Sequence, residues 1–206
     1  ISVCYSNASR MICSETSDME VRLSCGFELV EQLHRSHCRN VSHFQLMPIP
    51  RGSLDSLQPV RSDAYFVEDT SQLLIAVHAV GLNFRDVLNV LDMYPGDPGP
   101  PGGDFSGVVV NTPPSLPLNS ILGIGVSVFG LASGCLGTHT VTSVDATAPV
   151  PGQLSHSEAS TLPTVYVTVE LALRWSAGSC PGEHVLVHAA TGGVGMAATS
   201  VIASMH

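Results

Sequence analysis

Residues 183–195, with the sequence EHVLVHAATGGVG, form the stretch that decides the fold. An apolar, β-branched run stops at a glycine cluster and is followed by small residues, which predicts a strand, a tight turn and a helix. Glycines let such a turn approach a pyrophosphate, and the first N–H groups of the helix donate hydrogen bonds to it. The alternative is an ordinary strand-to-helix turn of an α/β protein, so the upstream residues must decide between the two.

The composition is that of a globular protein. The chain has 206 residues, of which 44% are hydrophobic and only 12% charged, so it is long and apolar enough to build a core. Eight Lys and Arg residues against 17 Asp and Glu residues give a net charge of -9. This balance lacks the basic surface of nucleic-acid-binding proteins, and we expect no nucleic-acid partner.

The cysteines do not form a metal-binding pattern. They stand at positions 4, 13, 25, 38, 135 and 180 without a C-x-x-C pair, which excludes a zinc module, although a disulfide framework stays open for the first 38 residues. The N-terminus has no signal-peptide pattern. The most apolar window, Ser120–Gly137, is rich in glycine and alternates in polarity, which indicates barrel strands and not a membrane span. We expect a cytoplasmic protein without membrane contact.

The middle of the chain predicts several elements. Alternating apolar residues predict a strand over 71–80, and helical spacing with Asn83 as N-cap predicts a helix over 83–91. Proline and glycine predict a surface loop over 97–103. Short alternating segments over 126–132 and 138–142 fit a small barrel. Ser155 and Glu158 have capping-box spacing, and a linking helix is expected over 162–177.

Four blocks of sequence resemble one family. They are GLNFRDVL (81–88), MYPG (93–96), GGDFSGVV (102–109) and VHAATGGVGMAA (187–198). In this order and spacing they are similar to the enoyl reductase domains of polyketide and fatty acid synthases. Those domains belong to the medium-chain dehydrogenase/reductase superfamily, together with the quinone oxidoreductases. Residues 51–57, RGSLDSL, resemble the entry sequence of the synthase domains and favour them over a stand-alone quinone reductase.

The resemblance implies a mixed β and α/β fold, in which a GroES-like β-barrel is followed by the first strand, turn and helix of a Rossmann domain. Residues 1–50 are then a linker or the remnant of a preceding domain, and residues 51–160 the GroES-like substrate domain. Residues 161–206 are the linking helix and the start of an incomplete NADPH-binding Rossmann domain. The strand that would choose between NADH and NADPH is not among these residues. We therefore expect a fragment that is inactive alone.

The implied chemistry is the reduction of an α,β-unsaturated acyl thioester by NADPH. Hydride goes to the β-carbon and a proton to the α-carbon, and the protein positions the reactants and stabilises the enolate. The implied partners are an acyl thioester on an acyl carrier protein and neighbouring synthase domains. Tyr94 is the candidate catalytic proton donor, because a phenol stays protonated at neutral pH. A tyrosine that closes a Tyr-Pro-Gly turn is the alternative.

The same resemblance implies the cofactor-binding residues. Asn83 matches an asparagine beside the nicotinamide ribose, with helix capping as its other role. Thr168 falls where the family has a threonine near the cofactor. The pyrophosphate turn comprises Gly192, Gly193, Val194 and Gly195.

Other residues qualify the match. The zinc enzymes of the superfamily have a cysteine where this chain has residues 83–86, so zinc is not expected as a cofactor. His78 is expected to be exposed and without a partner, and Arg85 and Asp86 are expected to form a structural salt bridge and not to take part in catalysis. Glu170 replaces a usual aromatic residue and brings a carboxylate toward the cofactor site. Two alternatives stay open: a free-standing quinone or enone oxidoreductase, and a non-catalytic remnant or scaffold domain.

Overall fold

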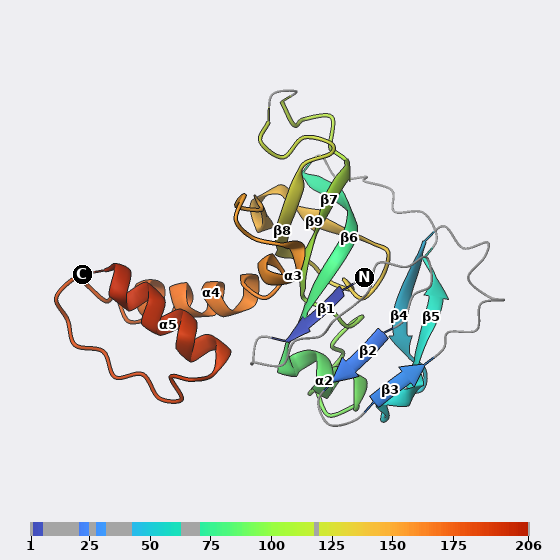
Figure 1. Ribbon diagram of the computed structural model, residues 1–206, viewed down its shortest axis with the longest axis horizontal. Coiled ribbons are helices and arrows are strands. Elements are labelled where there is room, and N and C mark those ends of the chain that lie inside the picture. Colours follow the sequence, from blue (N-terminus) through green and yellow to red (C-terminus); the bar gives the residue numbers. More distant parts are fainter. Residues whose placement is uncertain are drawn as a thin grey trace.

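The computed structural model describes residues 2–5, 21–24, 28–31, 43–62, 71–117 and 120–205. It consists of a curled, mostly antiparallel sheet and a two-helix unit that extends from one side of it (Figure 1). This is the mixed β and α/β class expected from the sequence. In the described part of the chain, no helix is long and apolar enough to cross a membrane.

The sheet is built around β6 (Gln72–Leu82) and β7 (Asp104–Asn111), which pair antiparallel along most of their length. β6 also pairs with β9 (His139–Ser143) through its first half and, in parallel, with β1 (Ser2–Tyr5) through its last residues. β8 (Ser127–Leu131) and β10 (Thr147–Pro149) follow on the other side of β7. The strands predicted over 71–80, 126–132 and 138–142 are thereby confirmed within one or two residues.

Alternation along β6 produces the core. Leu73, Ile75 and Val77 are buried in turn, and together with Phe105 and Val109 of β7 they form the centre of the barrel cluster. Side chains that alternate across a strand place every second residue on the inner face, so the period-2 pattern of the sequence fills the barrel.

A hairpin lies against the edge of this barrel. It consists of β4 (Phe44–Pro48), a 3₁₀ turn η1 (Leu54–Ser56) and β5 (Leu57–Arg61). A different hairpin is formed by β2 (Val21–Ser24) and β3 (Glu28–Glu31). The first hairpin is joined to the barrel through backbone hydrogen bonds of β4. The Leu46 N–H donates to the Leu136 carbonyl at 2.6 Å, and the Thr138 N–H donates to the Phe44 carbonyl at 2.9 Å. Strands therefore begin before residue 51, and the expected domain boundaries stay a prediction.

The helices follow the predicted order. α2 (Phe84–Val90) comes after β6, and α3 (His156–Ala159) begins with the predicted capping box, in which the Glu158 carboxylate accepts from the Ser155 N–H at 2.9 Å. A second 3₁₀ turn, η2 (Val144–Ala146), precedes β10. The linking helix is α4 (Pro163–Glu170), which continues directly as π-helical turns in η3 (Leu171–Ser176).

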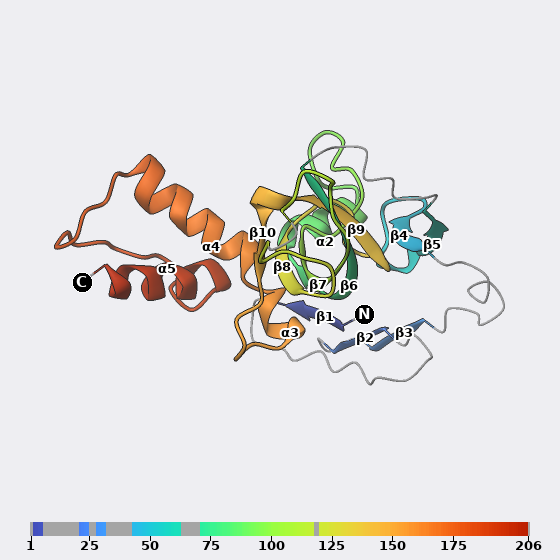
Figure 2. The ribbon, with the colours of Figure 1, turned by 90° about the horizontal axis from the view of Figure 1, so that it is seen from above.

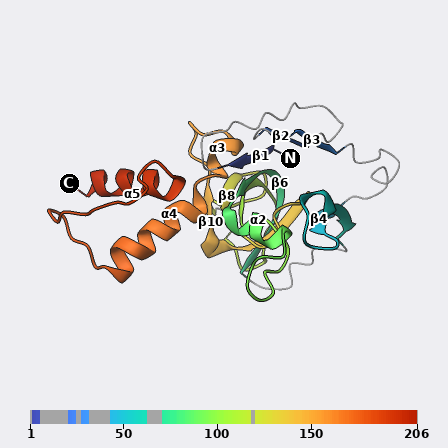
Figure 3. The same cartoon turned by 90° about the horizontal axis from the view of Figure 1, so that it is seen from below.

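α5 (Gly193–Ser204) packs beside α4, and both helices lead away from the barrel (Figures 1 and 2). Val165 and Val169 of α4 meet Ala197 and Val201 of α5 in a second core cluster, separate from the barrel core. Figure 3 shows the same unit from below, with the two helix starts nearest the barrel. The glycine turn that precedes α5 is thereby brought to the barrel side of the unit.

The predicted strand over residues 183–190 is wrong. This segment is neither helix nor strand, and Leu186 is 81% exposed. A strand requires a neighbouring strand for its N–H and C=O groups, and none of the described strands pairs with this segment. The glycine turn and the helix after it form without that partner.

The expectation that His78 has no partner is also wrong. The rings of His78 on β6 and His156 on α3 lie 4.7 Å apart, and His156 Nδ1 is 2.7 Å from the Ser106 hydroxyl. His43 similarly meets His139, with their Nδ1 atoms 2.8 Å apart. Two histidines close to His43 in the sequence, His34 and His37, lie outside the described residues, as do the side chains of the first four cysteines.

The His78–His156 pair predicts a loss of stability in mild acid. Burial, followed by the charge of His78, lowers the pKa of His156 below its usual 6.5. The unfolded chain therefore takes up a proton first as the pH falls through 6.5, and the free energy of unfolding decreases from there toward the folded pKa. We expect the urea midpoint to fall between about pH 7.5 and pH 5.5. His156→Gln should show a smaller decrease, and an unchanged decrease in this variant would contradict the assignment.

Candidate functional site

Three side chains meet where the barrel joins the two-helix unit. Asn83 follows β6, Asp104 begins β7, and Thr164 is the second residue of α4. The Asn83 Nδ2 group donates to Asp104 Oδ2 at 3.1 Å and lies 3.5 Å from Thr164 Oγ1. The Thr164 hydroxyl donates to Asp104 Oδ1 at 2.6 Å, and the Thr164 N–H donates to Asp104 Oδ2 at 3.3 Å.

Asp104 is the centre of this cluster and is only 1% exposed. Burial raises the pKa of its carboxyl group above the usual value, while the hydrogen bonds from Thr164 and Asn83 act in the opposite direction. The register places Asp104 opposite Gly81. A Cβ on Gly81 would collide with the Ser160 carbonyl oxygen, so this glycine allows the chain before α4 to approach the barrel closely.

Asn83 occupies the predicted N-cap position of α2, with extended backbone angles of φ -105 and ψ 159. The Asp86 carboxylate accepts from the Asn83 N–H at 2.9 Å and, with its other oxygen, from the Gly102 N–H at 2.9 Å. Asp86 thus has a structural role, but it fills this role by accepting hydrogen bonds from the backbone and not through the expected salt bridge: it joins the start of α2 to the Gly102–Gly103 turn.

Tyr94 contacts a residue of α2. Its ring centroid is 5.2 Å from the Arg85 guanidinium carbon, a cation–π contact, and Arg85 also donates to the Pro98 carbonyl at 3.4 Å. Arg85 lies in the first turn of α2, whereas Tyr94 follows the end of this helix in the chain. Tyr94 is half-buried and keeps part of its surface open to solvent.

Thr168 lies one helical turn after Thr164, on the same face of α4. Its hydroxyl donates to the Thr164 carbonyl within the helix at 2.7 Å, and its side chain is exposed. Thr168 thus bonds to the backbone of Thr164, and no hydrogen bond is recorded from it to the side chains of Asn83 and Asp104. Glu170, the unexpected carboxylate, forms an ion pair with Arg174 at 3.1 Å, which offsets its charge.

The glycine turn has the shape of an anion site. Gly192 is the N-cap of α5, and a Cβ on Gly195 would collide with the Ala189 carbonyl oxygen and lie 2.7 Å from the Ala190 Cα. The first N–H groups of a helix have no carbonyl partner within the helix, and they carry the positive end of its dipole. Gly193, Val194 and Gly195 provide these groups, so the residues present fit a pyrophosphate.

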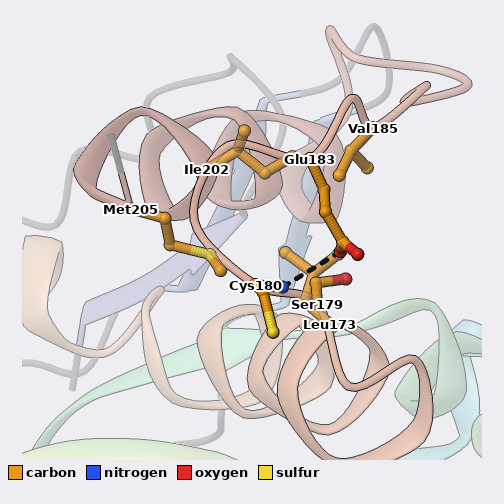
Figure 4. Close-up of a pocket in the computed structure, with 7 residues that line it drawn as sticks. All are labelled: Leu173, Ser179, Cys180, Glu183, Val185, Ile202 and Met205. Carbon is orange, nitrogen blue, oxygen red and sulfur yellow. Dashed lines mark hydrogen bonds between the residues drawn. The ribbon is translucent and has the colours of Figure 1, made fainter.

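A shallow pocket lies elsewhere, toward the far end of the two-helix unit (Figure 4). It is lined by Leu173, Ser179, Cys180, Glu183, Val185, Ile202 and Met205. The Glu183 carboxylate accepts from the Cys180 N–H at 3.0 Å and closes the local turn. The pocket contains none of the predicted site residues. Within the described residues, no group of three or more His, Cys, Asp or Glu side chains is arranged to hold a metal ion.

The sequence alone does not indicate two members of the cluster at Asn83, namely Asp104 and Thr164. Asp104 stood within a block that resembles the family, and Thr164 stood at the predicted start of the linking helix, but neither position indicated a contact. The two are 60 positions apart, and only the folded chain brings them together.

Known proteins resemble this chain in sequence and in fold. The chain is 40% identical over 162 residues to the pikromycin polyketide synthase component PikAII of Streptomyces venezuelae, a match that covers 77% of this chain and 4% of the synthase. The crystal structure of the CurK enoyl reductase superposes with a TM-score of 0.70 at 31% identity, over 79% of this chain and 52% of that one. The human synaptic vesicle membrane protein VAT-1 homolog-like protein gives a TM-score of 0.66 at 29% identity, again over 79% and 52%. No family model matches.

The barrel followed by a linking helix and a glycine turn is the arrangement that this chain shares with these solved structures, and it defines the class of the protein, that of the medium-chain dehydrogenases and reductases. The chain belongs to the quinone oxidoreductase-like medium-chain dehydrogenase/reductase superfamily, and within it the chain is similar to the enoyl reductases of polyketide synthases. The chain spans about half the length of the solved structures it matches and a small fraction of the synthases.

Proposed function

We propose that this chain is the barrel-bearing part of an enoyl reductase domain that reduces an α,β-unsaturated acyl thioester with NADPH. The observation that carries the proposal is the likeness to the CurK enoyl reductase, which extends over 79% of the chain. Polyketide synthases are similar to this chain in sequence. The substrate would accordingly be an acyl chain on an acyl carrier protein, and other synthase domains would be its neighbours.

NADPH, when bound, supplies the hydride for the β-carbon. In the proposal, the turn formed by Gly192, Gly193, Val194 and Gly195 holds its pyrophosphate, and Asn83 contacts its nicotinamide ribose. Thr168, one helical turn after Thr164 on α4, lies near the cofactor in this proposal. A mycobacterial protein of the same fold, 24% identical, has been solved as a complex with NADPH.

The test of this proposal uses the native polypeptide, whether or not it extends beyond these 206 residues. A short enoyl thioester and NADPH are mixed with it, and the loss of NADPH absorbance is followed. Oxidation that depends on the thioester supports the proposal. Oxidation with a quinone but not with the thioester favours the alternative of a quinone oxidoreductase. No binding of NADPH would leave the scaffold alternative.

Tyr94→Phe is expected to lower the rate about 100-fold, the effect of losing one general acid. The phenol would give its proton to the α-carbon, and phenylalanine keeps the ring beside Arg85 without that proton. Rate and stereochemistry at the α-carbon are measured in deuterated water. Tyr166→Phe on α4 is the matched control and should keep the wild-type rate. An unchanged rate and stereochemistry in Tyr94→Phe would rule out this role.

We also propose that the 206 residues alone do not catalyse the reaction. The proposal is supported by the exposure of Leu186 and by the absence of a paired strand over 183–190 among the described residues. A Rossmann cofactor site requires the sheet that those residues would join.

A further inference from the structure

We infer that Asp104 is a positioning residue that fixes the orientation of the Asn83 carboxamide toward the cofactor. The inference rests on the proposed function, because it assigns a purpose to the hydrogen-bond cluster around the candidate ribose contact. Asp104 itself would not touch the cofactor and would act through Asn83.

The direction of the hydrogen bonds determines the amide orientation. Asp104 Oδ2 also accepts from the Thr164 N–H, so this oxygen is an acceptor, and the Asn83 atom that lies 3.1 Å from it is the NH₂ nitrogen. The NH₂ nitrogen and the oxygen of a carboxamide point in different directions from the same carbon atom. Because the nitrogen faces Asp104, the oxygen is turned away from Asp104. Without a carboxylate at this place, the two orientations of the amide would be far less distinct.

Thr164 completes the constraint. Its hydroxyl has a single hydrogen, which goes to Asp104 Oδ1 at 2.6 Å, so toward Asn83 Nδ2 at 3.5 Å the same oxygen is the acceptor. The Thr164 N–H adds a further hydrogen bond to Asp104 at 3.3 Å. The carboxylate thus ties the amide of Asn83 to the start of α4, the helix that packs beside the glycine turn helix.

Stability alone does not account for a charge at this position. Asp104 is 1% exposed, and a buried carboxylate costs folding free energy that an apolar residue would not. Positions where a chain keeps a buried charge at such a cost are expected to serve binding or catalysis. The partners of Asp104 are a candidate cofactor residue and the helix that leads to the cofactor turn, which favours binding.

The experiment measures the NADPH dissociation constant of the native polypeptide by nicotinamide fluorescence, together with kcat and the melting temperature. Asp104→Asn and Thr164→Val should each weaken NADPH binding about tenfold, the effect of one hydrogen bond. Ser106→Ala is the matched control. Like Asp104, Ser106 is a buried polar residue of β7, and its hydroxyl donates to the Val128 carbonyl at 3.0 Å. Loss of this hydroxyl should lower the melting temperature without changing the NADPH affinity.

A double-mutant cycle separates positioning from general damage. If Asp104 acts through Asn83, Asn83→Ala combined with Asp104→Asn should bind NADPH as weakly as Asn83→Ala alone. Additive losses would overturn the inference, as would wild-type affinity in both Asp104→Asn and Thr164→Val. If Asp104→Asn does not fold, Thr164→Val and its cycle with Asn83→Ala decide. A wild-type polypeptide that does not bind NADPH would overturn the proposed function itself, and the inference with it.

Discussion

Replacing Gly107 with alanine should prevent the barrel from closing. A Cβ at this position of β7 would collide with the Ala76 carbonyl oxygen and lie 2.9 Å from the Ile75 Cγ2 atom on β6. Backbone of a central strand has little room to move, so β6 and β7 must separate or shift register. We expect a loss of more than about 3 kcal/mol in the free energy of unfolding, above the usual range for an overpacked core.

Urea unfolding of the 206-residue chain, followed by far-UV circular dichroism, measures this loss. Gly103→Ala is the control, because a Cβ there has no atom within 4 Å and the position does not require a positive φ. Its midpoint should stay close to that of the wild type. Equal midpoints for Gly107→Ala and Gly103→Ala would contradict the close approach of β6 and β7.

Replacing Gly195 with alanine should release α5 from α4. The added Cβ would collide with the Ala189 carbonyl oxygen and lie 2.7 Å from the Ala190 Cα, both of them backbone atoms of the segment before the helix. The first turn of α5 must then move, and with it the packing of Ala197 and Val201 against α4. In the native polypeptide, we expect NADPH affinity to fall at least about 100-fold, since a small displacement of a binding loop is costly.

Hydrogen exchange provides a readout of Gly195→Ala that does not depend on the cofactor. The amides of α5 should exchange faster, whereas those of β6 and β7 should keep their protection. Gly192→Ala tests the geometry within the same turn. Its Cβ would lie 3.4 Å from the Ala189 oxygen, an ordinary contact, so the exchange of α5 should be nearly unchanged. Fast exchange in both variants would contradict the packing described for this turn.

The sequence by itself predicted most of the fold. Alternation over 71–80 and helical spacing over 83–91 reflect local requirements, since every second residue of β6 must be apolar to fill the barrel. The capping box at Ser155 and the start of α5 at the glycine turn depend only on neighbours along the chain. For that reason these elements could be located from the sequence, as could Asn83 and the turn at 192–195.

Tertiary structure decided the rest. The apolar run over 183–190 has the composition of a strand but no neighbouring strand to pair with in the described part of the chain, and pairing is a property of the sheet and not of the segment. His78 found its partner in His156, 78 positions away, because α3 packs on β6.

The candidate site shows the same division between local motifs, which the sequence reveals, and contacts between distant segments, which only the fold creates. Asn83 and the glycines carry a local signature, whereas Asp104 and Thr164 become functional neighbours only through the register of β7 with β6 and the start of α4. Local motifs in the sequence marked the candidate cofactor residues. The packing of the barrel against the linking helix brought the buried carboxylate of Asp104 to Asn83, because hydrogen bonds form only between atoms that the fold places about 3 Å apart.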